Sequence, residues 1–309
     1  MPALADQLQP VFGPALVGSW INAMVYMLEL ILAYQYFGRV RRLLSPGAET
    51  TFVKIVVIIQ LIVDTVGMCG TSAYVYLLVV SHWGDVDVLT QNLWPGTVYC
   101  LTLGMSQCIV QMYLIWRYAI LSKNYALCVI FGLGAITGLV GSFIGGISTI
   151  TVFNTVEKRP RVIPIIMMWH ISASSVDILV AIALVVQLMR YKTNFKRTQS
   201  VIKRLIIGAI QTGSVTSIFA LLSLLTFIAY PTTNVNLAFG FVVGRLYGCT
   251  LLFNLRSRKM DVHQIVQVDK DNDIRGIDTK LGTGTTAEDM GDDSASFGRG
   301  DRKASAVDI

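Results

Sequence analysis

Long segments without a single charged residue constrain this sequence more than any other feature. Residues 124–153 and 205–230 contain no Asp, Glu, Lys or Arg, and only 14% of the 309 residues are charged. A typical soluble domain has about 25% charged residues, because the outward faces of its helices meet water. Uncharged segments of this length are stable where lipid or other helices surround them. The sequence therefore predicts an integral membrane protein.

Seven apolar segments reach the ~20 residues that a helix needs to cross ~30 Å of hydrocarbon. Lipid offers no water to satisfy the backbone, so each segment is expected to be an α-helix. We predict an all-α, seven-transmembrane-helix bundle over residues 1–260. The acidic, Gly-, Ser- and Thr-rich residues 261–309 are predicted to be a disordered cytoplasmic tail. The predicted spans lie near residues 14–37, 53–80, 94–120, 126–151, 163–189, 205–230 and 235–255.

The distribution of Lys and Arg predicts the orientation of the bundle. Fifteen of them lie at the membrane face that follows spans one, three, five and seven, whereas the opposite face holds only Lys158, Arg159 and Arg161. Because cytoplasmic loops carry the excess of basic residues, we expect the N-terminus outside and the C-terminus in the cytoplasm. Either the plasma membrane or an internal membrane is compatible with this pattern.

The predicted partners follow from the same layout. The lipid bilayer is the first, and a cytoplasmic signalling partner is expected at the basic segment 190–204 and at the tail. Nucleic acid is not expected, since the basic residues lie between apolar spans. The three histidines do not suggest a metal site, and no cofactor is expected. The sequence contains no G-x-S-x-G elbow and no phosphate-binding glycine loop, so we do not expect an enzyme.

Glycines recur at helical spacing in two of the predicted spans. Such stripes let helix backbones approach closely in lipid. They indicate either packing inside the bundle, which we favour, or the seam of a homodimer. The stripe of span four comprises Gly134, Gly138, Gly141 and Gly145, and that of span seven comprises Gly240, Gly244 and Gly248.

The ionisable residues Glu29, Asp64, Asp177 and Arg245 lie in the middle or inner half of predicted spans. A charge in mid-membrane costs at least about 2.5 kcal/mol, so such groups usually face the interior and pair. Counting ~1.5 Å per residue from the span ends places Arg245 and Asp64 near the membrane centre. We predict an Arg245–Asp64 ion pair, with Asp177 or Glu29 as the alternative partner. The pair is either structural or part of a polar switch or proton pathway.

The fifth span also carries a polar column. His170, Ser174 and Asp177 are spaced i, i+4 and i+7 and therefore share one helix face. Span three contributes Gln107 and Gln111 at i and i+4. These side chains either line a polar cavity at the bundle centre or form interhelical hydrogen bonds, and the second interpretation is favoured.

A family resemblance is carried by three stretches of the second half of the chain. They are Ser175-Val176-Asp177-Ile178, the Thr212-Gly213 region, and Gly244-Arg245-Leu246-Tyr247-Gly248 followed by Leu251 to Arg258. The chain resembles the seven-helix proteins of mushroom-forming fungi that are grouped as domain-of-unknown-function family 6534. The order Asn254-Leu255-Arg256 departs from the Leu-Asn-x-Arg ending of that family. The resemblance implies a seven-helix fold and a membrane location, but no activity.

Two functions are compatible with these features, and the first is preferred. A receptor-like or sensor protein is suggested by seven spans, an outside N-terminus, a basic third inner loop and a tail rich in Ser and Thr. A transporter or channel would use an intramembrane cluster of Asp64, Asp177 and Arg245. A purely structural or lipid-organising role is a third option.

Overall fold

The computed structural model describes residues 2–43, 48–82, 93–151, 163–190, 196–230 and 233–255. The chain divides into two units, Met1–Asp261 and Val262–Ile309. The second unit lies outside the described residues, and with it the predicted tail. Most of the basic segment 190–204 likewise has no described side chains. All regular structure in the described residues is helical, so the prediction of an all-α protein is confirmed.

The helices cover the predicted spans. They are α1 (Pro2–Leu43), α2 (Ala48–Tyr76), the π-helical turn η1 (Leu77–Ser81), α4 (Trp94–Ser122), α5 (Tyr125–Thr151), α6 (Ile163–Arg190) and α7 (Lys196–Ala229). Helices α1 and α7 begin well before the predicted starts near residues 14 and 205. A further helix, Val235–Leu255, is called the final helix below. Six described helices are long and apolar enough to cross a membrane, and the shorter apolar stretch Gly213–Ala229 lies in α7. The chain is thus a multi-pass helical membrane protein.

Local sequence sets several helix boundaries. Pro95 lies in the first turn of α4, where the missing N–H leaves no hydrogen bond unmade. Lys123 ends the same helix in the left-handed conformation, with φ of 54°, and its N–H donates to the Ala119 carbonyl. Only Lys123 and Asn124 separate α4 from α5, so these two helices are antiparallel neighbours.

The bundle exposes apolar side chains and buries many of its polar side chains among apolar ones, as expected in lipid. Leu133 and Met24 are 61% and 72% exposed, whereas Asn22, Gln60 and Gln111 are at most 1% exposed. The final helix is the most buried of the six long spans: 67% of its most apolar window is covered, against 22–50% for the others. It therefore forms the core of the bundle.

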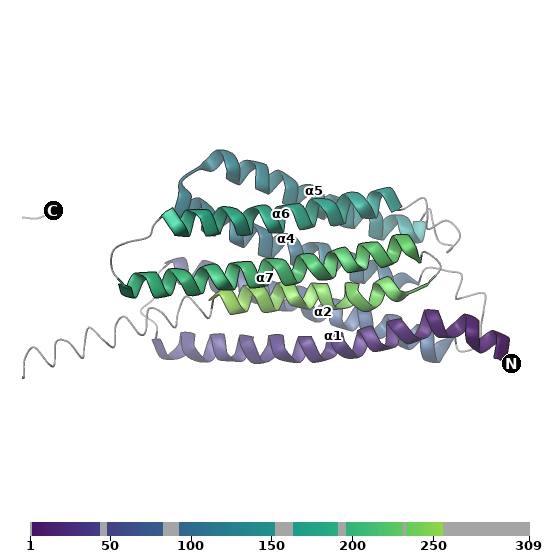
Figure 1. The fold of residues 1–309 in the computed structure, drawn as a ribbon. Coiled ribbons are helices and arrows are strands. Elements are labelled where there is room, and N and C mark those ends of the chain that lie inside the picture. Colours follow the sequence, from purple (N-terminus) through teal and green to yellow (C-terminus); the bar gives the residue numbers. More distant parts are fainter. Residues whose placement is uncertain are drawn as a thin grey trace, which may run out of the picture. The chain divides into compact units, whose positions relative to one another are not determined.

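Contacts between helices define two ends of the bundle (Figure 1). Helix α4 packs against α2, α5 and α6, while α6 also packs against α5 and α7, and α1 packs against α2. The first turns of α4, α6 and the final helix meet the last turns of α2, α5 and α7 at one end, which we call the Asn234 end. The opposite end contains Arg190.

Both glycine stripes are covered within the chain. A Cβ at Gly134 would lie 2.6 Å from Val176 Cγ2, and one at Gly141 would lie 3.0 Å from Trp169 Cβ, so the α5 stripe packs on α6. In the final helix, Gly240 lies against the Tyr99 hydroxyl and Gly244 lies against Leu103, both on α4. The stripes therefore serve packing inside the bundle, and a homodimer stays a prediction that would need another surface.

Candidate functional site

A buried ion pair lies at the centre of the bundle. Arg245 has ten residues on each side in the final helix, which puts its side chain midway along the span. Its Nη1 is 2.7 Å from Asp64 Oδ1, and the two side chains are only 5% and 2% exposed. The structure thus brings together the two residues whose depth in the membrane suggested a pair.

Helix α1 supplies further contacts of the Arg245 guanidinium. Its Nε donates to Asn22 Oδ1 at 3.2 Å, and its Cζ lies 5.8 Å from the centre of the Tyr26 ring. The Asn22 amide in turn donates to Met68 Sδ on α2 at 3.2 Å. A cation on an aromatic face is stabilised by the ring quadrupole, so Arg245 joins α1, α2 and the final helix.

Amide and hydroxyl groups connect Asp64 to α4. Gln60 Nε2 donates to Asp64 Oδ2 at 2.6 Å and also contacts Ser106 Oγ at 2.5 Å. Ser106 Oγ donates to the Gly244 carbonyl of the final helix at 3.4 Å. Interhelical hydrogen bonds of this kind contribute about 0.6–2 kcal/mol each in membranes. Four helices therefore converge on one charged site.

Glu29 reaches the same site from α1. Its side chain is fully buried, and neither carboxyl oxygen receives a hydrogen bond from a donor among the described residues. A Cβ at Gly248 would lie 2.7 Å from Asp64 Oδ2 and would collide with Glu29 Oε1. The two carboxyl groups therefore occupy the space that a side chain at position 248 would need, and glycine there is what admits them.

Asp177 lies apart from this site, which corrects the predicted Asp64, Asp177 and Arg245 cluster. Its Oδ1 accepts from Gln111 Nε2 at 2.8 Å and its Oδ2 accepts from the Tyr247 hydroxyl at 2.7 Å. The reason is helical geometry. Arg245 and Tyr247 are two positions apart and so point about 200° away from each other around the final helix. One residue faces α2 and the other faces α6.

The polar column of α6 divides among different environments. Trp169 Nε1 donates to Gln107 Oε1 at 3.2 Å, so both glutamines of α4 make interhelical hydrogen bonds to α6. Ser174 Oγ is buried and has no hydrogen-bond partner among the described side chains and backbone. His170 lies at the side of a cavity near the Asn234 end.

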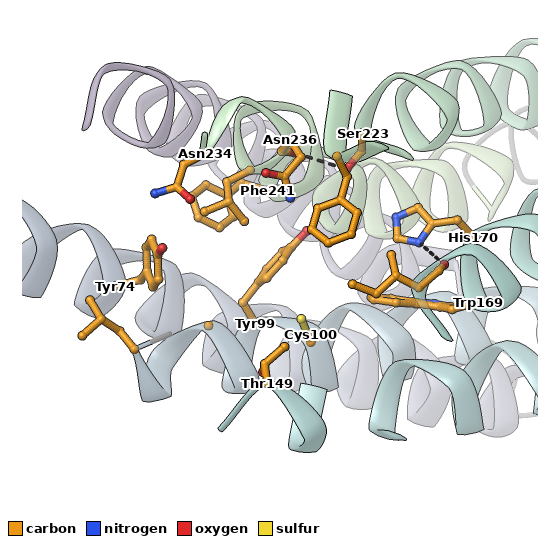
Figure 2. Close-up of a pocket in the computed structure, with 15 residues that line it drawn as sticks. Tyr74, Tyr99, Cys100, Thr149, Trp169, His170, Ser223, Asn234, Asn236 and Phe241 are labelled. Atoms are coloured by element: carbon orange, nitrogen blue, oxygen red, sulfur yellow. Dashed lines mark hydrogen bonds between the residues drawn. The ribbon is translucent and has the colours of Figure 1, made fainter. Parts of the chain in front are cut away.

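This cavity, called the aromatic pocket below, has a volume of about 110 Å³ (Figure 2). Cavities of this order hold several waters or a small organic molecule. Its walls come from α2, α4, α5, α6, α7 and the final helix. The lining residues are Tyr74, Leu93, Gly96, Tyr99, Cys100, Thr149, Ile166, Trp169, His170, Ser223, Phe227, Asn234, Asn236, Leu237 and Phe241.

Aromatic rings form much of the wall. Phe241 lies edge-on to Tyr99, with ring centres 5.0 Å apart, and to Tyr74, with ring centres 6.2 Å apart. Edge-to-face pairs of this kind are favourable and hold the rings in fixed orientations. Figure 2 shows Tyr99 and Phe241 between Tyr74 on one side and His170 on the other. The pocket is thus a preformed apolar space.

A few polar atoms interrupt that apolar lining. His170 Nδ1 lies 3.1 Å from the Ile166 carbonyl, which can only accept, so Nδ1 carries the proton and Nε2 is the free acceptor of the neutral ring. Asn236 Oδ1 is buried and accepts no hydrogen bond from the described residues. Ser223 Oγ donates to the Asn236 backbone carbonyl at 3.2 Å. The pocket therefore offers acceptors to a ligand that carries a donor.

A smaller cavity, of about 20 Å³, lies beside the Asp177 site toward the Arg190 end. Arg117, Asp177, Tyr247 and Asn254 are among its lining residues. Its volume admits about one water molecule. Among the residues that the structure describes, no three His, Cys, Asp or Glu side chains converge as metal ligands.

Comparison with known proteins gives one match. Residues 173–260 match the model of a family of unknown function (DUF6534), so the family resemblance is confirmed over this part of the chain. The matched segment contains Asp177, Arg245 and Tyr247. No curated protein and no solved structure shows significant similarity to the chain.

Sequence reasoning missed the amide residues of the charged site and most of the aromatic pocket. Asn22 and Glu29 are seven residues apart, as expected for one helix face, and Gln60 precedes Asp64 by four residues. Buried amides at these spacings were therefore a usable signal. The aromatic pocket has no such signal, because its residues come from six helices whose relative rotations the sequence does not state.

Proposed function

We propose that this protein is a membrane receptor or sensor that binds a small, mostly apolar ligand in the aromatic pocket. The observation that carries the proposal is that the pocket and the buried ion pair share one helix. Phe241 lines the pocket, and Arg245 follows it by one turn of the final helix, about 6 Å along the axis. A ligand that displaces Phe241 acts directly on the helix that carries Arg245.

The lining of the pocket defines the class of ligand. Most of the wall is aromatic or aliphatic, and His170 Nε2 and Asn236 Oδ1 are among its acceptors. Ligand pockets of this type bind through apolar contact and use a few polar groups to fix orientation. An aromatic or short aliphatic alcohol has the right chemistry: an apolar body and one hydroxyl donor.

The two ends of the bundle take different roles in this proposal. The excess of Lys and Arg at the Arg190 end favours the cytoplasm for that end and the exterior for the pocket. The basic segment 190–204 then faces the inner leaflet, where it contacts a signalling partner or anionic lipid. Tyr247 and Asp177, below Arg245, join the final helix to α6, which leads into that segment.

Binding of a defined probe tests the proposal. The protein would be reconstituted in lipid nanodiscs, and saturable binding of a fluorinated benzyl alcohol would be followed by ¹⁹F NMR, with a fluorinated toluene as the analogue without a donor. We expect the alcohol to bind more tightly than the toluene. His170→Ala should weaken this preference, because it removes one of the acceptors. Ile171→Ala is the matched control, because Ile171 is the next residue of α6 and is half exposed on the lipid side.

Occupancy of the pocket is tested with Gly96→Phe, which places a ring in the cavity from α4. A Cβ added at Gly96 would make an ordinary van der Waals contact with the Tyr74 ring, at 3.6 Å, so the first atom of the new side chain is accommodated. We expect this variant to fold and to lose probe binding. Unchanged saturable binding in Gly96→Phe would refute the pocket as the site. Solute flux into protein-containing liposomes, dependent on Asp64, would instead favour a transporter.

A further inference from the structure

Two carboxyl groups and one guanidinium share the buried site at the bundle centre. Glu29 and Asp64 are 0% and 1% exposed, and Arg245 is 4% exposed. With both acids ionised, the site would carry a net negative charge in the middle of the membrane. Such a charge is costly unless a counter-charge is present, and here Arg245 is already paired with Asp64.

The hydrogen-bond donors around the site are distributed unequally. Asp64 accepts from Gln60 and is paired with Arg245, whereas neither Glu29 oxygen receives a donor from the described residues. An ionised carboxylate without a donor or a paired cation is far more costly to bury than a neutral acid. The environment of Asp64 therefore suits the charged form, and that of Glu29 suits the neutral form.

The contact between the two acids points the same way. Both carboxyl groups lie against Gly248, where oxygens of Glu29 and of Asp64 crowd the same Cβ position. Carboxyl oxygens are acceptors only, so a hydrogen bond between two carboxyl groups requires a proton on one of them. Two adjacent carboxylates also repel, which prevents both from ionising together.

We propose that Glu29 and Asp64 form a binding site for one proton. In this site Glu29 is the neutral acid and its O–H donates to Asp64, which remains ionised and paired with Arg245. The site then has zero net charge, and its one carboxylate is paired with its one guanidinium. This assignment does not depend on the receptor proposal, since it concerns a different site and a different ligand.

The other titratable groups near the site do not add a charge. Tyr26 on α1 lies under the Arg245 guanidinium, while Tyr99 on α4 and Cys249 on the final helix lie within electrostatic range of the site. Phenol and thiol groups are neutral when they carry their protons. Arg245 is therefore the cation among the described residues that face Glu29 and Asp64.

Infrared spectroscopy of the protein in lipid tests the proposal directly. A protonated carboxylic acid has a carbonyl band that is separate from the carboxylate bands. We expect this band at neutral pH, and we expect it to shift when glutamate is labelled with ¹³C at the side-chain carboxyl. Glu29→Gln should remove the shifted component, because the amide replaces the acid and still donates to Asp64. Asp177→Asn is the control and should leave the labelled component unchanged.

Stability provides a second, independent readout. The folded protein would hold a proton on Glu29 at neutral pH. The unfolded chain releases that proton above pH ~4.3, the ordinary pKa of glutamate. Because the folded state then binds one proton more, its stability falls as pH rises. We expect the unfolding equilibrium constant in mixed micelles to rise about tenfold per pH unit around neutral pH. Glu29→Gln should remove this component of the pH dependence.

Several results would overturn the assignment. If the wild type showed no labelled carboxylic-acid band at neutral pH, Glu29 would be ionised. A band insensitive to glutamate labelling but lost in Asp64→Asn would place the proton on Asp64. Stability that depends on sodium concentration at fixed pH, with no labelled band, would identify a metal cation as the occupant. The wild-type spectrum decides the question even if Glu29→Gln does not fold.

Discussion

Helix α1 and the final helix come into close backbone contact at Gly18 of α1. A Cβ on Gly18 would lie 2.6 Å from the Cα of Ala238 in the final helix, with Ala238 O at 3.3 Å. These are backbone atoms, so they cannot rotate away as a side-chain tip would. Carbon atoms pack best about 3.5–4.0 Å apart. Gly18→Ala should therefore push the two helices apart by about 1 Å at this point.

The cost of that separation can be worked out from its neighbours. Phe12 and Ala15 of α1 pack with Phe241 of the final helix, and Asn22 hydrogen-bonds Arg245. A radial gap of about 1 Å forfeits about half of the dispersion energy of each contact. Overpacking of this kind typically costs about 1–3 kcal/mol. We expect Gly18→Ala to lose that much stability relative to a matched glycine replacement.

Gly13→Ala is the matched replacement. Gly13 lies on the same helix, and nothing lies within 4 Å of the Cβ that it would gain. Both variants gain the same helix propensity, about 1 kcal/mol for Gly to Ala, so their difference isolates the contact with Ala238. Thermal unfolding in detergent, followed by circular dichroism, should give a midpoint about 2–12 °C lower for Gly18→Ala than for Gly13→Ala. Equal midpoints would refute the backbone contact.

Two further substitutions probe the buried polar sites. Tyr247→Phe removes the hydroxyl that donates to Asp177 and should cost about 1–2 kcal/mol in an equilibrium unfolding titration, whereas the same change at exposed Tyr76 should have no effect. Arg245→Met removes the cation beside Asp64 and should lower the free energy of unfolding by about 3–5 kcal/mol. Adding Asp64→Asn to this variant should restore much of that stability. If the effects of the two substitutions were simply additive, the ion pair would be refuted.

The spans were predictable because the bilayer fixes their length and forbids any open-chain alternative to a helix. Arg245 and Asp64 were predictable as a pair because depth along a span can be counted from its ends. Rotation about the helix axis cannot be counted in the same way. Asp177 lies at a depth in the membrane similar to that of Asp64. It nevertheless contacts Tyr247, which is on the opposite side of the final helix from Arg245.

The aromatic pocket could not be predicted from sequence patterns. Phe241 and Tyr99 look like ordinary apolar residues in their spans, and their edge-to-face contact depends on the packing of two helices. The glycine stripes gave partial information: they identified close approaches but not the neighbours. Only the packed structure shows that Gly248 makes room for Glu29 and Asp64.

The placement of the final helix at the core has a consequence for biosynthesis. The ribosome makes this helix after α1 to α7, so the earlier helices enter the bilayer while the position that it will fill is vacant. During that interval Asp64 lacks Arg245 and Asp177 lacks Tyr247. The acids of the nascent bundle therefore meet their partners only when translation delivers the final helix.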